Sequence, residues 1–102
     1  MQRRRLGIAV VRGRSMLPAL RDGDRLLVLH GANPRLGRLA VVRLGGVIAV
    51  KRVTRREPGG WWVERDNPAE GIDSWSHGAV PDEDVVARVV LRVWPPRLPR
   101  TS

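Results

Sequence analysis

The sequence contains no cysteine, one lysine and two histidines, and it has no long apolar run. The absence of cysteine excludes disulfides, a thiol nucleophile and Cys-ligated zinc. His30 and His77 are too few for a His-rich metal site, so we expect neither a metal nor a cofactor. No apolar run approaches the ~18 residues that indicate a membrane-spanning helix. The apolar stretch at 6–11 is shorter than the roughly 7–15 residues of a secretory signal, so we expect a soluble, cytoplasmic protein without a membrane span.

Basic residues dominate the charge of the chain. Its 102 residues include 19 Lys or Arg and 10 Asp or Glu, a net charge of +9. A chain of this length forms one domain, and its 42% of hydrophobic residues can supply a modest core. Residues 1–56 carry fourteen of the basic groups, which makes a nucleic-acid-binding module an alternative function. The arginines are interspersed with acidic and apolar residues, and no recognition motif accompanies them. We therefore favour ordinary surface charge and do not expect nucleic acid as a partner.

Short runs of Val, Ile and Leu recur between Gly, Pro, Asn and Asp, a pattern typical of β-structure. Gly45-Gly46, between two such runs, predicts a tight hairpin turn. Helical structure is expected only as single turns, at 15–20 and at 80–84. The sequence thus predicts a small, mainly β domain, with strands at residues 6–11, 25–30, 38–44, 47–54, 60–65 and 85–93.

Two segments fall outside this strand pattern. Residues 66–81 have no strand or helix period, and a loop of about sixteen residues in so small a domain is usually functional or disordered. Trp75 within it predicts that the loop packs against the rest of the domain. The proline-rich residues after Trp94 predict an extended tail. We therefore place the domain at residues 1–95 and the tail at 96–102.

Lys51 is the only lysine among nineteen basic residues. A lysine amine acts as a base when burial lowers its pKa from ~10.4 toward neutrality, whereas arginine cannot lose its proton in a protein. In a strand, Lys51 shares its face with Val47, Ala49 and Val53, and these apolar neighbours disfavour the charged form. A lysine that extends its charged end from the strand into water is the alternative. The single lysine in an arginine-rich chain favours a site that arginine cannot serve.

Ser15 is the serine best placed to act as a nucleophile. It lies in a bend between Gly13 and Pro18, where a hydroxyl and free backbone N–H groups can be presented together. The alternative is a simple helix N-cap. Without cysteine and with few histidines, a pair of serine and lysine is the catalytic arrangement that this chain most readily supplies.

Four segments of the chain, in order, resemble the motifs of one peptidase family. Residues 13–28, GRSMLPALRDGDRLLV, resemble the Ser-Met-x-Pro and Gly-Asp boxes of type I signal peptidases and their S24/S26 relatives. Residues 50–53 resemble the box with the catalytic lysine. Asp66-Asn67, followed by Asp73-Ser74, Gly78 and Pro81, resembles the late Asp-Asn…Asp-Ser-Arg…Gly…Pro box. Residues 86–95 resemble the closing strand, and the four motifs together cover about residues 8–95.

The resemblance implies a Ser/Lys-dyad endopeptidase with a mainly β fold of curved antiparallel sheets. Ser15 would be the nucleophile, with its backbone N–H in the oxyanion hole, and Lys51 would be the general base. Further residues would hold the loop that supports the dyad: Asp66, Asn67, Asp73 and Ser74. Three residues are candidates for substrate binding, with the core as their alternative location: Met16, Leu17 and Trp75.

The chain departs from the family pattern around this site. Arg65 replaces the glycine that usually precedes Asp-Asn, and Trp75 replaces the arginine after Asp-Ser. Gly71 aligns with a serine whose hydroxyl bonds the lysine in many members, and Ser74 or Ser76 would be its nearest replacement. These departures concern the support of the site and leave the dyad intact.

The missing membrane anchor and inserted domain, together with the high arginine content, make the chain similar to nickel-type superoxide dismutase maturation proteases. These remove the leader of the dismutase precursor, which we expect as the partner. A signal peptidase-like enzyme or a self-cleaving repressor-type peptidase is the alternative within the family. The self-cleaving alternative is less favoured because only a strand precedes Ser15 in this sequence.

Overall fold

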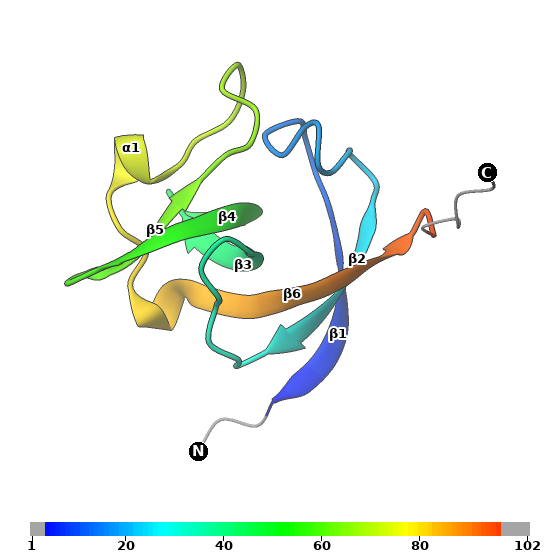
Figure 1. Ribbon diagram of the computed structural model, residues 1–102, viewed down its shortest axis with the longest axis horizontal. Helices are drawn as coiled ribbons and strands as arrows, with labels where there is room; N and C mark the ends of the chain where they lie inside the picture. The colour runs from blue at the N-terminus through cyan, green and yellow to red at the C-terminus, as the bar shows by residue number, and fades with distance from the viewer. Residues whose placement is uncertain (1–3, 97–102) are drawn as a thin grey trace.

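The computed structural model, which describes residues 4–96, contains a single six-stranded antiparallel sheet (Figure 1). Two short helical elements interrupt the chain before the last strand: α1, Ser74–His77, and the 3-10 turn η1, Asp82–Asp84. The mainly β prediction is confirmed, and every strand lies within three residues of its predicted bounds. The strands are β1 Arg5–Val10, β2 Arg25–His30, β3 Leu39–Leu44, β4 Val47–Glu57, β5 Gly60–Glu64 and β6 Val85–Trp94.

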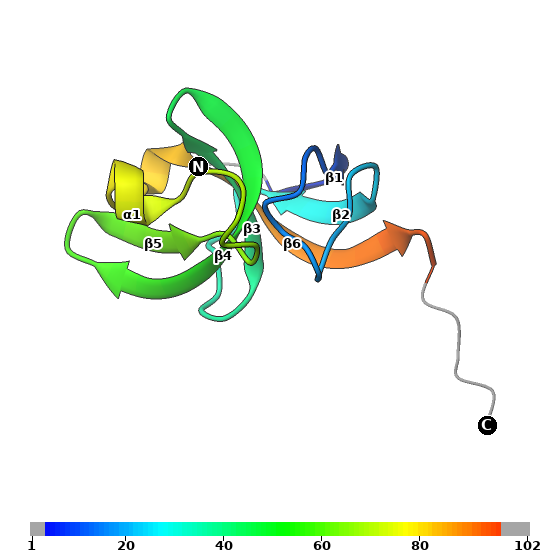
Figure 2. The ribbon, with the colours of Figure 1, turned by 90° about the horizontal axis from the view of Figure 1, so that it is seen from above.

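The long strand β6 joins two halves of the sheet, whose strand order is β1-β2-β6-β3-β4-β5. The first residues of β6 pair with β3, and residues 87–94 pair with β2. Register shifts interrupt both pairings, and such bulges bend a strand and increase its twist. The sheet therefore folds around itself, with β3, β4 and β5 on one side and β1, β2 and the end of β6 on the other (Figure 2).

The hairpin of β3 and β4 lies between two apolar clusters. Val41 and Val50 belong to the first cluster, which also contains residues of the chain between β1 and β2. Val42 and Val53 belong to the second cluster, together with Val63 of β5. Because successive residues of a strand point to opposite faces, one hairpin contributes to both clusters. Both faces of these strands are therefore apolar in the sequence.

Two local predictions are refined by the structure. Residues 15–19 form consecutive turns, in which the Leu20 N–H donates to the Met16 carbonyl at 2.9 Å, and no regular helix follows. The expected loop at 66–81 contains the single helical turn α1, because the Asp73 side chain accepts a hydrogen bond from the Trp75 N–H and caps it. The predicted tail at 96–102 lies outside the described residues except for Pro96. Among the described residues, no helix has the length and apolar character needed to cross a membrane.

Gly60, at the start of β5, fixes the return of the loop to the sheet. Trp61 and Val80 exchange two backbone hydrogen bonds of 2.7 Å, which close the segment that leaves β5 and comes back to it. A Cβ on Gly60 would lie 2.0 Å from the Val80 carbonyl oxygen, and its φ of +143° disfavours any other residue.

We expect Gly60→Ala to lower the free energy of unfolding by about 2–4 kcal/mol, since it adds strain and a backbone clash. Gly59→Ala is the matched control, because a Cβ there meets no atom within 4 Å and the backbone is not in the left-handed region. Its effect should stay within about 0.5 kcal/mol. Denaturant unfolding of both variants checks this, and equal losses would contradict the assigned role of Gly60.

Candidate active site

Ser15 and Lys51, 36 residues apart in the sequence, meet in the structure. The Lys51 Nζ lies 2.9 Å from the Ser15 Oγ and forms a hydrogen bond with it. Lys51 is only 2% exposed, whereas Ser15 is half-buried on the turn after β1. A buried amine in hydrogen-bond contact with a more accessible hydroxyl is the geometry of a general base beside a nucleophile.

The pairing of β3 with β4 makes room for the lysine side chain. Lys51 lies directly opposite Ala40, which is fully buried. The small side chain of Ala40 leaves space for the long lysine stem on this face of the hairpin. The next residue, Arg52, donates two hydrogen bonds to Asp66 and one to the Gly37 carbonyl. Consecutive residues of β4 therefore provide the buried amine of Lys51 and the Arg52 guanidinium, which binds Asp66.

The surroundings of Lys51 favour the neutral amine. Burial is the largest effect and lowers the pKa of Lys51 below its ordinary value of 10.5. The nearby Asp73 carboxylate raises this pKa, and the Arg65 guanidinium lowers it. The net shift is downward, so a larger fraction of the amine is unprotonated at a given pH than in an unfolded chain. An unprotonated amine can accept the proton of the Ser15 hydroxyl.

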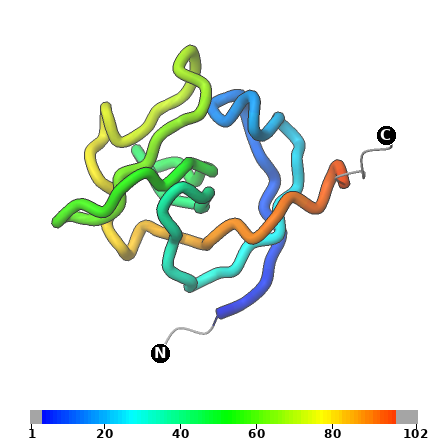
Figure 3. Tube along the Cα trace, viewed as in Figure 1, coloured from blue at the N-terminus to red at the C-terminus, as the bar shows by residue number. Residues whose placement is uncertain are grey.

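Asp66 and Asn67 fasten one end of the loop between β5 and α1 next to Ser15. The Asp66 carboxylate receives both hydrogen bonds of the Arg52 fork, at 2.9 and 2.8 Å. The Asn67 N–H donates to the Ser15 carbonyl at 2.8 Å, and its side-chain amide donates to the Arg14 carbonyl at 3.0 Å. The loop and the turn after β1 consequently lie side by side (Figure 1, Figure 3).

Asp73 and Ser74 fasten the other end of the loop to β5. Both are buried, at 4% and 1% exposure. Besides capping α1, Asp73 accepts a hydrogen bond from the Arg65 N–H at 3.2 Å. The Ser74 Oγ accepts a hydrogen bond from the Val63 N–H at 2.9 Å. The four residues that the sequence assigned to the supporting loop thus hold it at both ends.

Gly71 brings the middle of this loop onto Ser15. A Cβ on Gly71 would lie 2.5 Å from the Ser15 Cβ and 3.5 Å from the Lys51 Nζ. The backbone at Gly71 has a φ of +97°, which favours glycine. The Arg65 side chain donates a hydrogen bond to the Gly71 carbonyl and approaches Asp73 to 3.9 Å. The sequence showed Gly71 and Arg65 only as departures from the family pattern. It did not predict the approach of Gly71 to Ser15 or the hydrogen bond from Arg65 to the Gly71 carbonyl, because both depend on the conformation of the loop.

The two serines considered as replacements for the missing hydroxyl have other partners, so that prediction is wrong. Ser74 is bound to Val63 as described above. The Ser76 Oγ lies 3.1 Å from the Asp73 carbonyl and 2.9 Å from the His77 Nδ1. Within residues 4–96, the only hydrogen bond of the Lys51 amine is to Ser15.

An apolar cavity of about 210 Å³ opens beside Ser15, between β1, β4 and the turn that carries the serine. Met16 lines it and is 1% exposed, so this residue belongs both to the cavity and to the core. Leu17 is half-buried and does not line the cavity. The other lining residues are Ala9, Val10, Val11, Arg12, Val41, Ile48, Ala49 and Val50.

Trp75, the third candidate for substrate binding, lies in α1 and contacts β5. It is 69% exposed, and its ring meets that of Trp62 edge-on at a centroid distance of 5.2 Å. Its indole N–H donates to Glu64. The expectation that Trp75 packs against the domain agrees with these contacts. Among the described residues, no group of three or more His, Asp or Glu side chains is arranged to hold a metal ion.

Comparison with known proteins places this geometry in a family. A LexA repressor from Burkholderia thailandensis is 46% identical over 59 residues, which represent 57% of this chain and 27% of the repressor. The chain thus spans about a quarter of the length of that relative. The sequence model of the Peptidase S24-like family matches residues 1–90, which include both Ser15 and Lys51. Since this match covers most of the sequence, the chain belongs to the Peptidase S24-like family.

Proposed function

We propose that this protein is a Ser/Lys-dyad endopeptidase that removes the N-terminal leader of a precursor protein. The observation that carries the proposal is the 2.9 Å hydrogen bond between the Ser15 hydroxyl and the buried amine of Lys51. Membership of the Peptidase S24-like family supports the same reaction class. Packing alone does not account for Lys51, because a lysine at 2% exposure loses the hydration of its charge.

The geometry supports a two-step hydrolysis. In the first step, neutral Lys51 takes the Ser15 proton while the serine oxygen attacks the peptide carbonyl. The protonated amine then gives this proton to the leaving nitrogen, and the peptide bond breaks to leave an ester on Ser15. In the second step, a water molecule gives a proton to Lys51 and attacks the ester. Lys51 returns the proton to Ser15 as the acid product leaves.

The backbone N–H of Ser15 is available to stabilise the oxyanion that forms during each attack. The hydrogen bonds among residues 4–96 leave this N–H without an acceptor. It lies on the turn that Asn67 holds from both the Arg14 and the Ser15 carbonyls, at 3.0 and 2.8 Å. A fixed donor beside the reacting oxygen stabilises charge that develops in the transition state.

The cavity beside Ser15 supports a preference for small apolar side chains next to the cleaved bond. Its lining is dominated by alanine and valine, and the only charged residue among its lining residues is Arg12. The specific substrate in this proposal is the leader of nickel superoxide dismutase, which rests on the resemblance of the sequence. The cytoplasm is the compartment that we expect for this reaction.

Self-cleavage is the second candidate, and the match to the LexA repressor favours it. In that case, the bond that is cut belongs to the same polypeptide as Ser15. The two candidates differ in concentration dependence. Cleavage of a separate precursor accelerates with enzyme concentration, whereas the half-time of self-cleavage is independent of it.

Ser15→Ala, Lys51→Ala and Lys51→Arg should each lower precursor cleavage by at least about 1,000-fold, because each removes the nucleophile or the base. Arginine fails as a base because its guanidinium keeps its proton. Ser76→Ala is the matched control, since this exposed serine lies outside the dyad. Mass spectrometry of the new N-terminus measures the cleavage, and circular dichroism checks the fold. Cleavage at the wild-type rate by any of the three dyad variants would rule out the mechanism.

Gly71→Ala should lower kcat/KM about 10- to 100-fold, because the added methyl group displaces the loop or the serine. Gly78→Ala is the matched control. Gly78 has a similarly positive φ of +79°, but a Cβ there meets no atom within 4 Å. Both variants should lose stability in denaturant through the positive φ, Gly71→Ala more because of its clash with Ser15, and only Gly71→Ala should lose activity. Equal kinetic losses in the two variants would show that Gly71 does not act through Ser15.

A further inference from the structure

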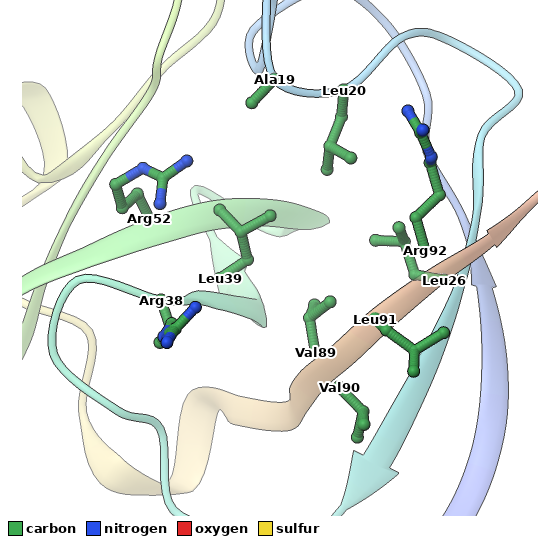
Figure 4. Close-up of a pocket in the computed structure, with 10 residues that line it drawn as sticks. All are labelled: Ala19, Leu20, Leu26, Arg38, Leu39, Arg52, Val89, Val90, Leu91 and Arg92. Atoms are coloured by element: carbon green, nitrogen blue, oxygen red, sulfur yellow. The ribbon is translucent and has the colours of Figure 1, made fainter. Parts of the chain in front are cut away.

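A second, larger cavity lies between β2, β3, β6 and the turn that carries Ser15 (Figure 4). Its volume is about 550 Å³, within the range of ligand-binding clefts. It shares no lining residue with the cavity beside Ser15. Apolar side chains such as Leu20, Leu26 and Leu39 form much of its wall, and three arginines complete it: Arg38, Arg52 and Arg92.

The cavity is positively charged, because three arginines line it and none of its lining residues is Asp or Glu. Arg52 is committed to Asp66 through two hydrogen bonds. Arg92 has only a distant contact, 3.9 Å, with Asp24. Arg38 has no ion pair within the part of the chain that the structure describes. Two guanidinium groups thus retain capacity for an anionic partner, and arginine binds carboxylates through a planar fork.

A bulge in β6 turns apolar side chains toward this cavity. Leu27 of β2 pairs with Leu91, and Val28 pairs with Val89, so Val90 has no partner residue in β2. An extra residue in one strand re-aims the neighbouring side chains. Val90 and Leu91 are consecutive, yet both line the cavity, and they are 49% and 50% exposed. The cavity is therefore open to solvent along β6 at Val90 and Leu91. An extended peptide segment needs such an opening in order to bind.

The dyad and this cavity are built on the same two segments. Leu20 lies five residues after Ser15 on one folded turn, and Arg52 directly follows Lys51 on β4. Even five fully extended residues span at most about 18 Å, and the hydrogen bond from Leu20 to Met16 shortens this distance. One polypeptide can thus reach both the nucleophile and the wall of the cavity at Leu20.

We propose that this cavity is a docking site for an acidic and apolar segment of the polypeptide substrate. In such a segment, Asp or Glu side chains bind Arg38 and Arg92, and a neighbouring Leu, Ile or Val side chain packs on Leu39 and Val90. The proposal rests on the proposed peptidase function. Charge disfavours the chain's own last residues as occupant, since they include Arg97 and Arg100. Nucleic acid is disfavoured because the lining contains no aromatic ring on which a base can stack.

Three labelled peptides test the docking site on the Ser15→Ala variant, where binding is separate from cleavage. Glu-Leu-Asp-Val-Glu combines acidic and apolar residues, Glu-Ser-Asp-Ser-Glu is acidic alone, and Lys-Leu-Lys-Val-Lys reverses the charge. Fluorescence anisotropy should show binding of the first peptide at least tenfold tighter than that of the other two. Equal binding of the first and second peptides, or preference for the third, would overturn the proposal.

Variants of the lining identify where the peptide binds. Arg38→Glu and Val90→Ser, added separately, should each raise the Kd of the first peptide, Arg38→Glu by at least tenfold. Arg5→Glu is the charge-matched control, because Arg5 is exposed at the start of β1 and lines neither cavity. It should change the Kd less than about twofold. Equal losses for Arg38→Glu and Arg5→Glu would show attraction by net charge alone and overturn the site, as would displacement of the peptide by duplex DNA.

The docking site and the peptidase function fail in different ways. Precursor cleavage that depends on Ser15, together with peptide binding that ignores Arg38→Glu and Val90→Ser, would overturn the docking site and leave the peptidase standing. Peptide binding that both variants weaken, without Ser15-dependent cleavage of the precursor, would support the cavity as a peptide-binding site. It would overturn the peptidase and, with it, the identification of the bound peptide as a substrate segment.

Discussion

The burial of one amine is the constraint on which the rest of this structure depends. Lys51 is 2% exposed in a hairpin that lies between two apolar clusters, and its amine is hydrogen-bonded to the Ser15 hydroxyl. Burial lowers the pKa of Lys51 below 10.5, so between the lowered pKa and 10.5 the unfolded chain binds a proton that the folded chain releases. The free energy of unfolding therefore rises with pH across this interval, and the burial is least favourable at lower pH. Functional sites often contain a titratable group, such as this lysine, whose burial shifts its pKa and lowers the free energy of unfolding.

The hydrogen-bonded pair of Ser15 and Lys51 depends on chain segments that are distant in sequence and tied together by short contacts. Asn67 holds the backbone of the serine turn, and Asp66 is tied to Arg52, beside Lys51 in the chain. Gly71 contacts Ser15 directly, and Arg65 holds the Gly71 carbonyl. One loop thus contacts Ser15 and is tied to β4 at Arg52, the residue after Lys51. The turn that carries Ser15 and strand β4 also contribute residues to the arginine-lined cavity. The proposed chemistry and the proposed docking are therefore linked in one small domain.

Much of the fold was predictable because antiparallel strands carry local signals. Apolar runs between Gly, Pro and Asn located all six strands, and Gly45-Gly46 located the turn between β3 and β4. The pairing of Ser15 with Lys51 followed from the scarcity of lysine and from the family motifs. Which face of β4 points into the core was not predictable, because both faces do. Val50 belongs to the first apolar cluster and Val53 to the second. The contact of Gly71 with Ser15, the cap of α1 and the bulge at Val90 depend on tertiary geometry, which periodicity does not report.

The presence of a single lysine makes the central claim directly measurable. In protein labelled with 13C-lysine, the one side-chain Cε resonance reports the titration of Lys51 without any assignment. We expect a pKa clearly below that of the same chain in denaturant, and a higher pKa in Arg65→Ala, because the neighbouring positive charge is removed. A folded-state titration that coincides with the denatured chain, near 10.5, would contradict the account of Lys51 as a buried base.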